Sequence, residues 1–219
     1  MTTEILYSFR RCPYAIRVRW ALLICEIKVE LREIDLKNKP LDFLNISSSK
    51  TVPILIKKNN EIIEESLDIV LWALSKTKKK NLTSIYIPKK KKETIFRTIY
   101  ENDNKFKYHL DRFKYSARFN SNEEENHFSE ANKFIKKWNK LLTENKYLFG
   151  EKPTIADWCI WPFVRQFKIA CESKKKKNYF DNPIQKWAEH FENHKNFKYL
   201  MHKYDLWETS SQKNYFPIN

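Results

Sequence analysis

The stretch YSFRRCPYAIRVRWALL, Tyr7–Leu23, decides the fold of the first part of the chain. An apolar and aromatic run with strand character ends just before Cys12, and Pro13 suits the first position of a helix. Apolar residues after the proline recur at helical spacing: Ile16, Trp20, Leu23 and Ile27. The pattern predicts a strand, a short loop and a helix, with the cysteine at their junction.

The segments that follow extend this pattern into a small α/β domain. Residues Val29–Leu36 predict a second strand, which makes a βαβ unit with a parallel pair. A short irregular helix is expected around Leu41–Ile46. The segments TVPILI and EIIEE then predict a hairpin, and Ser66 is expected to cap a helix that runs through Leu74. The predicted order of elements is βαβ-α-ββα.

The second half of the chain has mainly helical periodicity. We expect a first domain over residues 1–77, a basic linker over 78–92 and an all-helical domain over 93–219. Within the last, Thr154 and Asp157 are spaced to form a capping box, and Pro162 is expected to kink or restart the helix that follows. One predicted core face holds Ile95, Ile99, Phe106, Leu110 and Phe113.

The composition describes a globular protein. Hydrophobic residues make up 42% and aromatic residues 15% of 219 residues. No stretch approaches the roughly 18 uninterrupted apolar residues of a membrane span, and the first residues have no basic region followed by an apolar one. We therefore expect a soluble cytoplasmic protein without membrane contact.

The formal net charge is +15, and lysines gather in runs at residues 78–80, 89–92 and 174–177. Such runs attract phosphates without reading a base sequence. The alternative, which we favour, is that they lie on solvated loops, because no recognised nucleic-acid-binding module accompanies them. Nucleic acid is therefore not an expected partner.

Four widely separated cysteines form neither metal-binding pairs nor a disulfide framework, so we expect reduced thiols and no metal. Cys12 differs from the others because the start of a helix, together with Arg10 and Arg11, favours the thiolate over the thiol. Ala15 stands where a dithiol motif has its second cysteine. By itself Cys12 is equally explained as a small buried residue beside a helix start.

Three further features complement the thiol. Val52 precedes Pro53, and a cis bond there would leave the Val52 backbone free to pair with an extended ligand. The segment Glu65-Ser66 places a carboxylate, a hydroxyl and helix N–H groups together, and Lys39 can meet a second carboxylate. Each feature also has an ordinary explanation, as an edge-strand proline, a helix cap and a surface lysine. Together they describe a site for a small peptide with two carboxylates and one amine, which is the shape and charge of glutathione.

These motifs resemble the cytosolic glutathione S-transferase superfamily. The stretches YSFRRCPYAIRVRWAL, LKNKP, TVPIL and EESLDIVLWAL are most similar to the omega class and its bacterial relatives. The stretch TIADWCIWPFVRQF is similar to the core helix of the family's second domain. The resemblance implies a thioredoxin-like α/β domain followed by an all-α domain that contributes the acceptor-substrate pocket, and a homodimer. Unlike the family pattern, the loop NISSSK before Val52 lacks proline and glycine.

The resemblance also implies roles for individual residues. Cys12 matches the catalytic cysteine, and the glutathione contacts fall on Tyr14, Lys39, Val52, Pro53, Glu65 and Ser66. Asn102 or Tyr108 is placed at the acceptor pocket.

The resulting hypothesis is glutathione-dependent thiol transfer through a mixed disulfide on Cys12, with dehydroascorbate reduction as a related activity. A second hypothesis is conjugation of glutathione to an electrophile, assisted by Tyr7 or Ser8. A third, from another class, is a non-enzymatic interaction module on the same fold.

Overall fold

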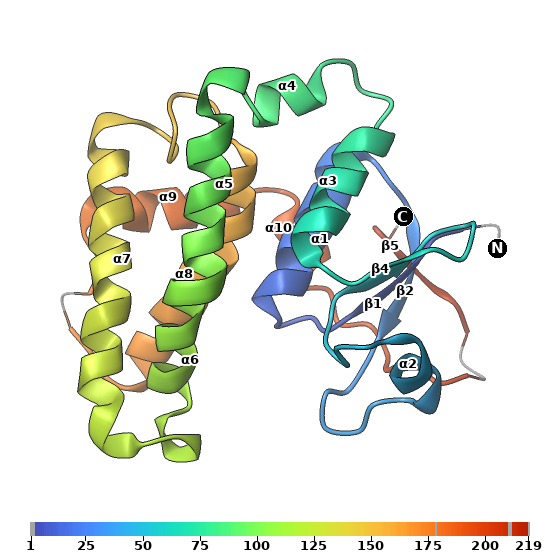
Figure 1. Cartoon of the computed structure of the whole chain (residues 1–219), viewed down its shortest axis with the longest axis horizontal. Coiled ribbons are helices and arrows are strands. Elements are labelled where there is room, and N and C mark those ends of the chain that lie inside the picture. The colour runs from blue at the N-terminus through green and yellow to red at the C-terminus, as the bar shows by residue number, and fades with distance from the viewer. Residues whose placement is uncertain (1–2, 178, 210–211, 219) are drawn as a thin grey trace. The chain divides into compact units, whose positions relative to one another are not determined.

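The computed structural model describes residues 3–177, 179–209 and 212–218, and it divides the chain into two compact units. The first unit runs to Leu82 and takes up the chain again from Lys195 onward. The second unit is Thr83–His194. Figure 1 shows the first unit as a sheet with helices around it and the second as a group of helices.

A mixed sheet forms the centre of the first unit. Its strands are β1 (Ile5–Ser8), β2 (Val29–Glu33), β3 (Ile54–Ile56), β4 (Ile62–Ile63) and β5 (Asn214–Phe216), in the spatial order β4-β3-β1-β2-β5. The pair β1 and β2 is parallel, and the other pairs are antiparallel. The predicted βαβ unit and hairpin are both present.

Helices cover the sheet because its side chains alternate between two apolar faces. Helix α1 (Pro13–Cys25) packs against α3 (Ser66–Lys76), while α2 (Leu41–Ile46) lies on the other side of the strands (Figure 1). On the α2 side, Phe43 joins a buried cluster with Ile5 and Tyr7 of β1. The intervening Leu6 is fully buried as well. Ser66 is the first residue of α3, and Glu65 holds the capping position that the sequence assigned to Ser66.

The second unit is built from helices. Its elements include α4 (Leu82–Tyr86) at its boundary, α5 (Lys92–Glu101), a π-helical turn (Asn102–Phe106), α6 (Lys107–Lys114), α7 (Glu124–Glu144), α8 (Ile155–Ser173) and α9 (Asn182–Glu192). The predicted core residues Phe106, Leu110 and Phe113 are fully buried. None of the helices in the described ranges is long and apolar enough to cross a bilayer. The chain thus has a thioredoxin-like α/β domain followed by a helical domain.

The capping box at the start of α8 is present as predicted. Thr154 is the N-cap of α8. The buried Asp157 carboxylate accepts hydrogen bonds from the Thr154 backbone N–H at 2.7 Å and from the Thr154 hydroxyl at 3.0 Å. The same carboxylate accepts from the Leu148 N–H and the Trp187 indole. Helix α8 continues through Pro162 without restarting, because both sides of the helix are buried against neighbours that hold it.

The expected domain boundaries differ from the observed units. After His194 the chain returns to the first unit, where it forms α10 (Phe197–Leu200) and adds β5 to the free edge of β2. A three-residue strand carries too little alternation to be recognised, and its existence depends on the edge it joins. The expected linker 78–92 contains α4 and a 3₁₀ turn over Lys89–Lys91, with the change of unit inside α4.

The returning strand should contribute to the stability of the first unit. Phe216 in β5 is fully buried, whereas its neighbour Tyr215 is 39% exposed. We expect Phe216→Ala to lower the free energy of unfolding by about 3 kcal/mol. The matched change Tyr215→Ala should cost less than about 1 kcal/mol. Urea denaturation of both variants measures this, and equal effects would contradict the assignment of β5 to the core.

Candidate functional site

The strand-to-helix junction places Cys12 at the N-terminus of α1. Strand β1 ends at Ser8, and the Cys12 N–H donates to the Phe9 carbonyl at 3.0 Å, which closes a tight turn. The Cys12 carbonyl then accepts the first helical hydrogen bond, from Ile16 at 2.9 Å. Cys12 is the N-cap residue and Pro13 the first residue of the helix, as predicted. The thiol therefore lies at the positive end of α1.

Cys12 is also the accessible thiol. It is partly exposed, whereas Cys25, Cys159 and Cys171 are at most 2% exposed. Burial raises the pKa of both Cys25 and Cys171 to about 12. Thiolate chemistry near neutral pH is therefore concentrated at Cys12.

The residues Val52 and Pro53 lie beside this thiol. The Val52–Pro53 peptide bond is cis, as the sequence suggested, and both residues are buried. The Cys12 Sγ lies 3.7 Å from the Val52 carbonyl oxygen, within the range of a weak thiol hydrogen bond. The fold thus brings together two predicted site residues that are 40 positions apart in the chain.

Ser66 and Glu65 stand at the N-terminus of α3. The buried Ser66 hydroxyl accepts from Arg17 twice, with Nε at 3.1 Å and Nη2 at 2.6 Å. Because the guanidinium only donates, the hydroxyl keeps its own proton for a further acceptor. Glu65 is exposed. The sequence predicted no role for Arg17. The only indication of one in the sequence is that this arginine stands among apolar residues of the predicted helix.

Tyr14 and Lys39 are partly exposed. The Tyr14 ring faces the Arg17 guanidinium, with the guanidinium carbon 4.9 Å from the ring centroid. The Lys39 ammonium donates to the Lys50 carbonyl at 2.8 Å, so it braces the loop before Val52.

The loop before Val52 has a clamp that sequence reasoning missed. The Glu64 carboxylate accepts from the backbone N–H and the hydroxyl of both Ser48 and Ser49, at 2.8 to 3.2 Å. These hydrogen bonds lower the pKa of Glu64 to about 2, and the one from the Ser49 backbone N–H has the largest effect. The clamp therefore holds the loop before Val52, which contains neither proline nor glycine.

The alternative hydroxyls of the first strand are buried. Tyr7 is 1% exposed, and its hydroxyl accepts from Arg32 Nη1 at 2.5 Å. Burial raises the pKa of Tyr7 despite this arginine. Ser8 is fully buried.

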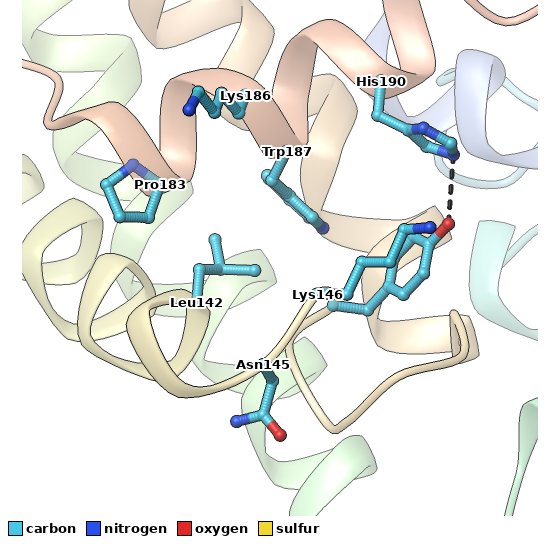
Figure 2. Close-up of a pocket in the computed structure, with 8 residues that line it drawn as sticks. Leu142, Asn145, Lys146, Pro183, Lys186, Trp187 and His190 are labelled. Atoms are coloured by element: carbon cyan, nitrogen blue, oxygen red, sulfur yellow. Dashed lines mark hydrogen bonds between the residues drawn. The ribbon is translucent and has the colours of Figure 1, made fainter.

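The acceptor-pocket candidates lie on the second unit. Asn102 is fully buried and donates to Asp103 at 2.8 Å, whereas Tyr108 is exposed and carries the Arg112 guanidinium 3.5 Å from its ring centroid. A separate hollow of about 280 Å³ lies between the end of α7 and α9 (Figure 2). There the Tyr147 hydroxyl lies 3.1 Å from His190 Nε2.

Several lysines of the basic runs have acidic partners. Lys79 pairs with Glu26 at 2.8 Å and Lys174 with Glu124 at 2.6 Å, while Lys176 pairs with Glu125. These three lysines therefore have a counter-charge within the protein.

Comparison with known proteins identifies the class. A family model described as "Glutathione S-transferase, N-terminal domain" matches residues 6–81, and one described as "Glutathione S-transferase, C-terminal domain" matches residues 116–193. Together the two matches take in well over half of the chain. The chain belongs to the glutathione S-transferase superfamily.

Individual proteins are similar to this chain. The chain is 26% identical to glutathione S-transferase omega-1 of Mus musculus over 167 residues, which are 74% of this chain and 66% of that protein, just under two thirds of its length. The structure of glutathione transferase Omega 3C from Trametes versicolor covers 94% of this chain and 92% of its own, with 16% identity and a TM-score of 0.77. A glutathione S-transferase from Rhodospirillum rubrum F11 covers 92% and 93%, with 18% identity and a TM-score of 0.73. The two structures share the fold of this chain.

The exposure of the four thiols makes a direct prediction. Under native conditions near neutral pH, iodoacetamide should modify Cys12 and leave the other cysteines unmodified until the protein unfolds. Peptide mass spectrometry after brief labelling, with a urea-unfolded sample as the control, measures this. Labelling of Cys25 or Cys171 at the rate of Cys12 would contradict the assignment.

The Glu64 clamp makes a second prediction. Glu64→Ala should speed amide exchange at Ser48 and Ser49, because both N–H groups lose their acceptor. The matched control is Glu61→Ala, whose carboxylate pairs with Lys57 instead. The clamp lowers the pKa of Glu64 from 4.5 to about 2. Its contribution to stability is therefore complete above pH 4.5 and is lost as the pH falls toward 2, where the folded protein takes up the proton. Unchanged exchange in Glu64→Ala at neutral pH would rule out the clamp.

Proposed function

We propose that this protein is a glutathione-dependent thiol transferase that uses Cys12 as its nucleophile. The observation that carries the proposal is the position of Cys12 as the accessible thiol, at the start of α1 and 3.7 Å from the Val52 carbonyl. A thiolate held at a helix N-terminus is the reactive form in thiol–disulfide exchange.

The surrounding groups fit an extended tripeptide. The backbone of Val52, before cis Pro53, offers hydrogen bonds to the central residue of glutathione. The Ser66 hydroxyl, held by Arg17, has a proton to donate to the γ-glutamyl carboxylate, and Glu65 can receive the amine. Lys39 would exchange its carbonyl partner for the glycyl carboxylate. Tyr14, whose ring faces Arg17 at the start of α1, is a further proposed contact to glutathione.

The proposed reaction has two exchange steps. The Cys12 thiolate attacks the glutathione sulfur of a mixed disulfide, forms Cys12–S–S–glutathione and releases the other thiol, which takes up a proton. A second glutathione, as thiolate, attacks that disulfide, regenerates the Cys12 thiolate and leaves as oxidised glutathione. Overall, one mixed disulfide is reduced and two glutathione sulfurs become one disulfide. Ala15 supports this one-cysteine route because it cannot form an internal disulfide.

Dehydroascorbate is a second proposed acceptor, suggested by the similarity to the omega class. Its reduction to ascorbate takes two electrons, which two glutathione molecules supply as they form one disulfide. We also propose that the protein is a cytoplasmic homodimer and that the helical domain contributes the acceptor pocket.

Conjugation of glutathione to an electrophile is the second candidate function. In that reaction Tyr7 or Ser8 would assist by donating to the glutathione sulfur, and the burial of both residues disfavours such assistance. The third candidate, an interaction module, has no need of an accessible thiol at a helix start beside Val52, so the presence of Cys12 there disfavours it.

The test is to replace Cys12 by Ser and measure reduction of the mixed disulfide between glutathione and 2-mercaptoethanol. We expect loss of activity on the order of 100-fold or more, because the nucleophile is removed. Cys25→Ala, which removes a buried thiol, is the matched control and should keep its activity.

Three outcomes would count against the proposal. Full disulfide reduction by Cys12→Ser would exclude the mechanism, and aryl-halide conjugation retained in that variant would favour the conjugating enzyme. Failure of the protein to bind immobilised glutathione, together with tight salt-sensitive binding of nucleic acid, would favour the interaction module.

A further inference from the structure

We infer that Arg19 is a positioning residue that holds the loop before Cys12 and stabilises the Cys12 thiolate, with Glu33 as its competing counter-ion. The inference rests on the proposed use of Cys12 as the nucleophile. Neither the motifs that suggest glutathione binding nor the family matches assign a role to this buried pair.

Helix geometry directs Arg19 toward the cysteine. Cys12 is the N-cap of α1, and Arg19 lies seven residues further on, which is two turns along the same helix face. Long side chains on a helix point back toward its N-terminus. In agreement, Arg19 Nη2 donates to the Arg10 carbonyl at 2.6 Å, two residues before the cysteine.

The Arg19 guanidinium is fully buried and incompletely paired. Its exposed fraction is 0%, and among the described residues its Nε and Nη1 atoms have no hydrogen-bond partner. A buried cation with unused donors is costly to the fold. A compensating negative charge nearby would offset that cost, and the Cys12 thiolate supplies one.

Glu33 completes the cluster from β2. It is 5% exposed, and its Oε1 accepts a hydrogen bond from the Arg10 backbone N–H. Its Oε2 has no partner among the described residues. The Arg10 backbone is thus held from both sides, with its carbonyl on Arg19 and its N–H on Glu33.

The charges around Arg19 act in both directions. Burial lowers the pKa of Arg19, the negative charges of Glu33 and of a Cys12 thiolate oppose this, and Arg10 adds to it. Tyr204 is also close to Arg19, but burial raises its pKa, so its hydroxyl stays neutral at neutral pH. Burial likewise raises the pKa of Glu33, and Arg19 counteracts it. Cys12 caps α1 and Arg19 lies within it, Glu33 ends β2, Arg10 lies in the loop between β1 and α1, and Tyr204 lies in the C-terminal segment. Arg19 therefore favours the thiolate, whereas the carboxylate of Glu33 disfavours it.

Two variants should consequently move Cys12 in opposite directions. Arg19→Met removes the positive charge, so iodoacetamide should alkylate Cys12 roughly tenfold more slowly at neutral pH, the factor that one nearby opposite charge is typically worth. The midpoint of its rate against pH should rise. Glu33→Gln removes the negative charge, so the midpoint should fall.

The experiment is Cys12 alkylation from about pH 5 to about pH 10, read by peptide mass spectrometry. Arg19→Lys keeps the charge and should restore a midpoint near that of the unmodified protein. Arg11→Ala is the comparison variant: this exposed arginine also adds positive charge beside Cys12, but water screens it, so its removal should move the midpoint less than Arg19→Met does. The double variant Arg19→Met/Glu33→Gln removes both buried charges and guards against a single variant that fails to fold.

Unmoved midpoints in Arg19→Met and Glu33→Gln would overturn the inference, as would shifts of the same sign in both. The measurement uses no glutathione. Opposite shifts without mixed-disulfide reduction would therefore defeat the proposed function alone, and reduction without shifts would defeat this inference alone.

Discussion

The parallel pairing of β1 with β2 is the constraint on which the site depends. Parallel neighbours need a crossover between them, and α1 supplies it. The carboxyl end of β1 must therefore lead directly into the N-terminus of a helix, and Cys12 occupies that turn. The same pairing places Glu33, the last residue of β2, beside the loop that carries the cysteine. The thiol and its electrostatic surroundings thus follow from one topological choice.

Buried arginines connect this junction to the rest of the first unit. Arg17 holds Ser66 at the start of α3, and Arg19 holds the backbone of Arg10. Each arginine lies within a helix that is otherwise largely apolar and buried. Burying a guanidinium is unfavourable unless its surroundings use the charge. Two of them in one helix point to a unit that gives up some stability to define the geometry and charge of a site.

The sequence predicted the strand-loop-helix start, the hairpin and the capping box, because each depends on local rules of periodicity, turns and caps. It also predicted that Cys12 and Val52 share a site, through the resemblance to a known family. It missed β5, whose three residues form a strand only where β2 offers an edge. The Glu64 clamp was missed for a similar reason, since its serines lie 15 and 16 residues away in the chain.

The sequence by itself therefore determined that Cys12 lies at a helix start, since a cysteine followed by proline after an apolar strand specifies that position. Only the tertiary structure decided which thiol is accessible, that the C-terminal segment returns to the first unit, and that Tyr7 and Ser8 are buried. It also decided that Arg19 and Glu33 both bind the Arg10 backbone, Arg19 at the carbonyl and Glu33 at the N–H. These properties depend on burial and on contacts between distant segments, which no local pattern specifies.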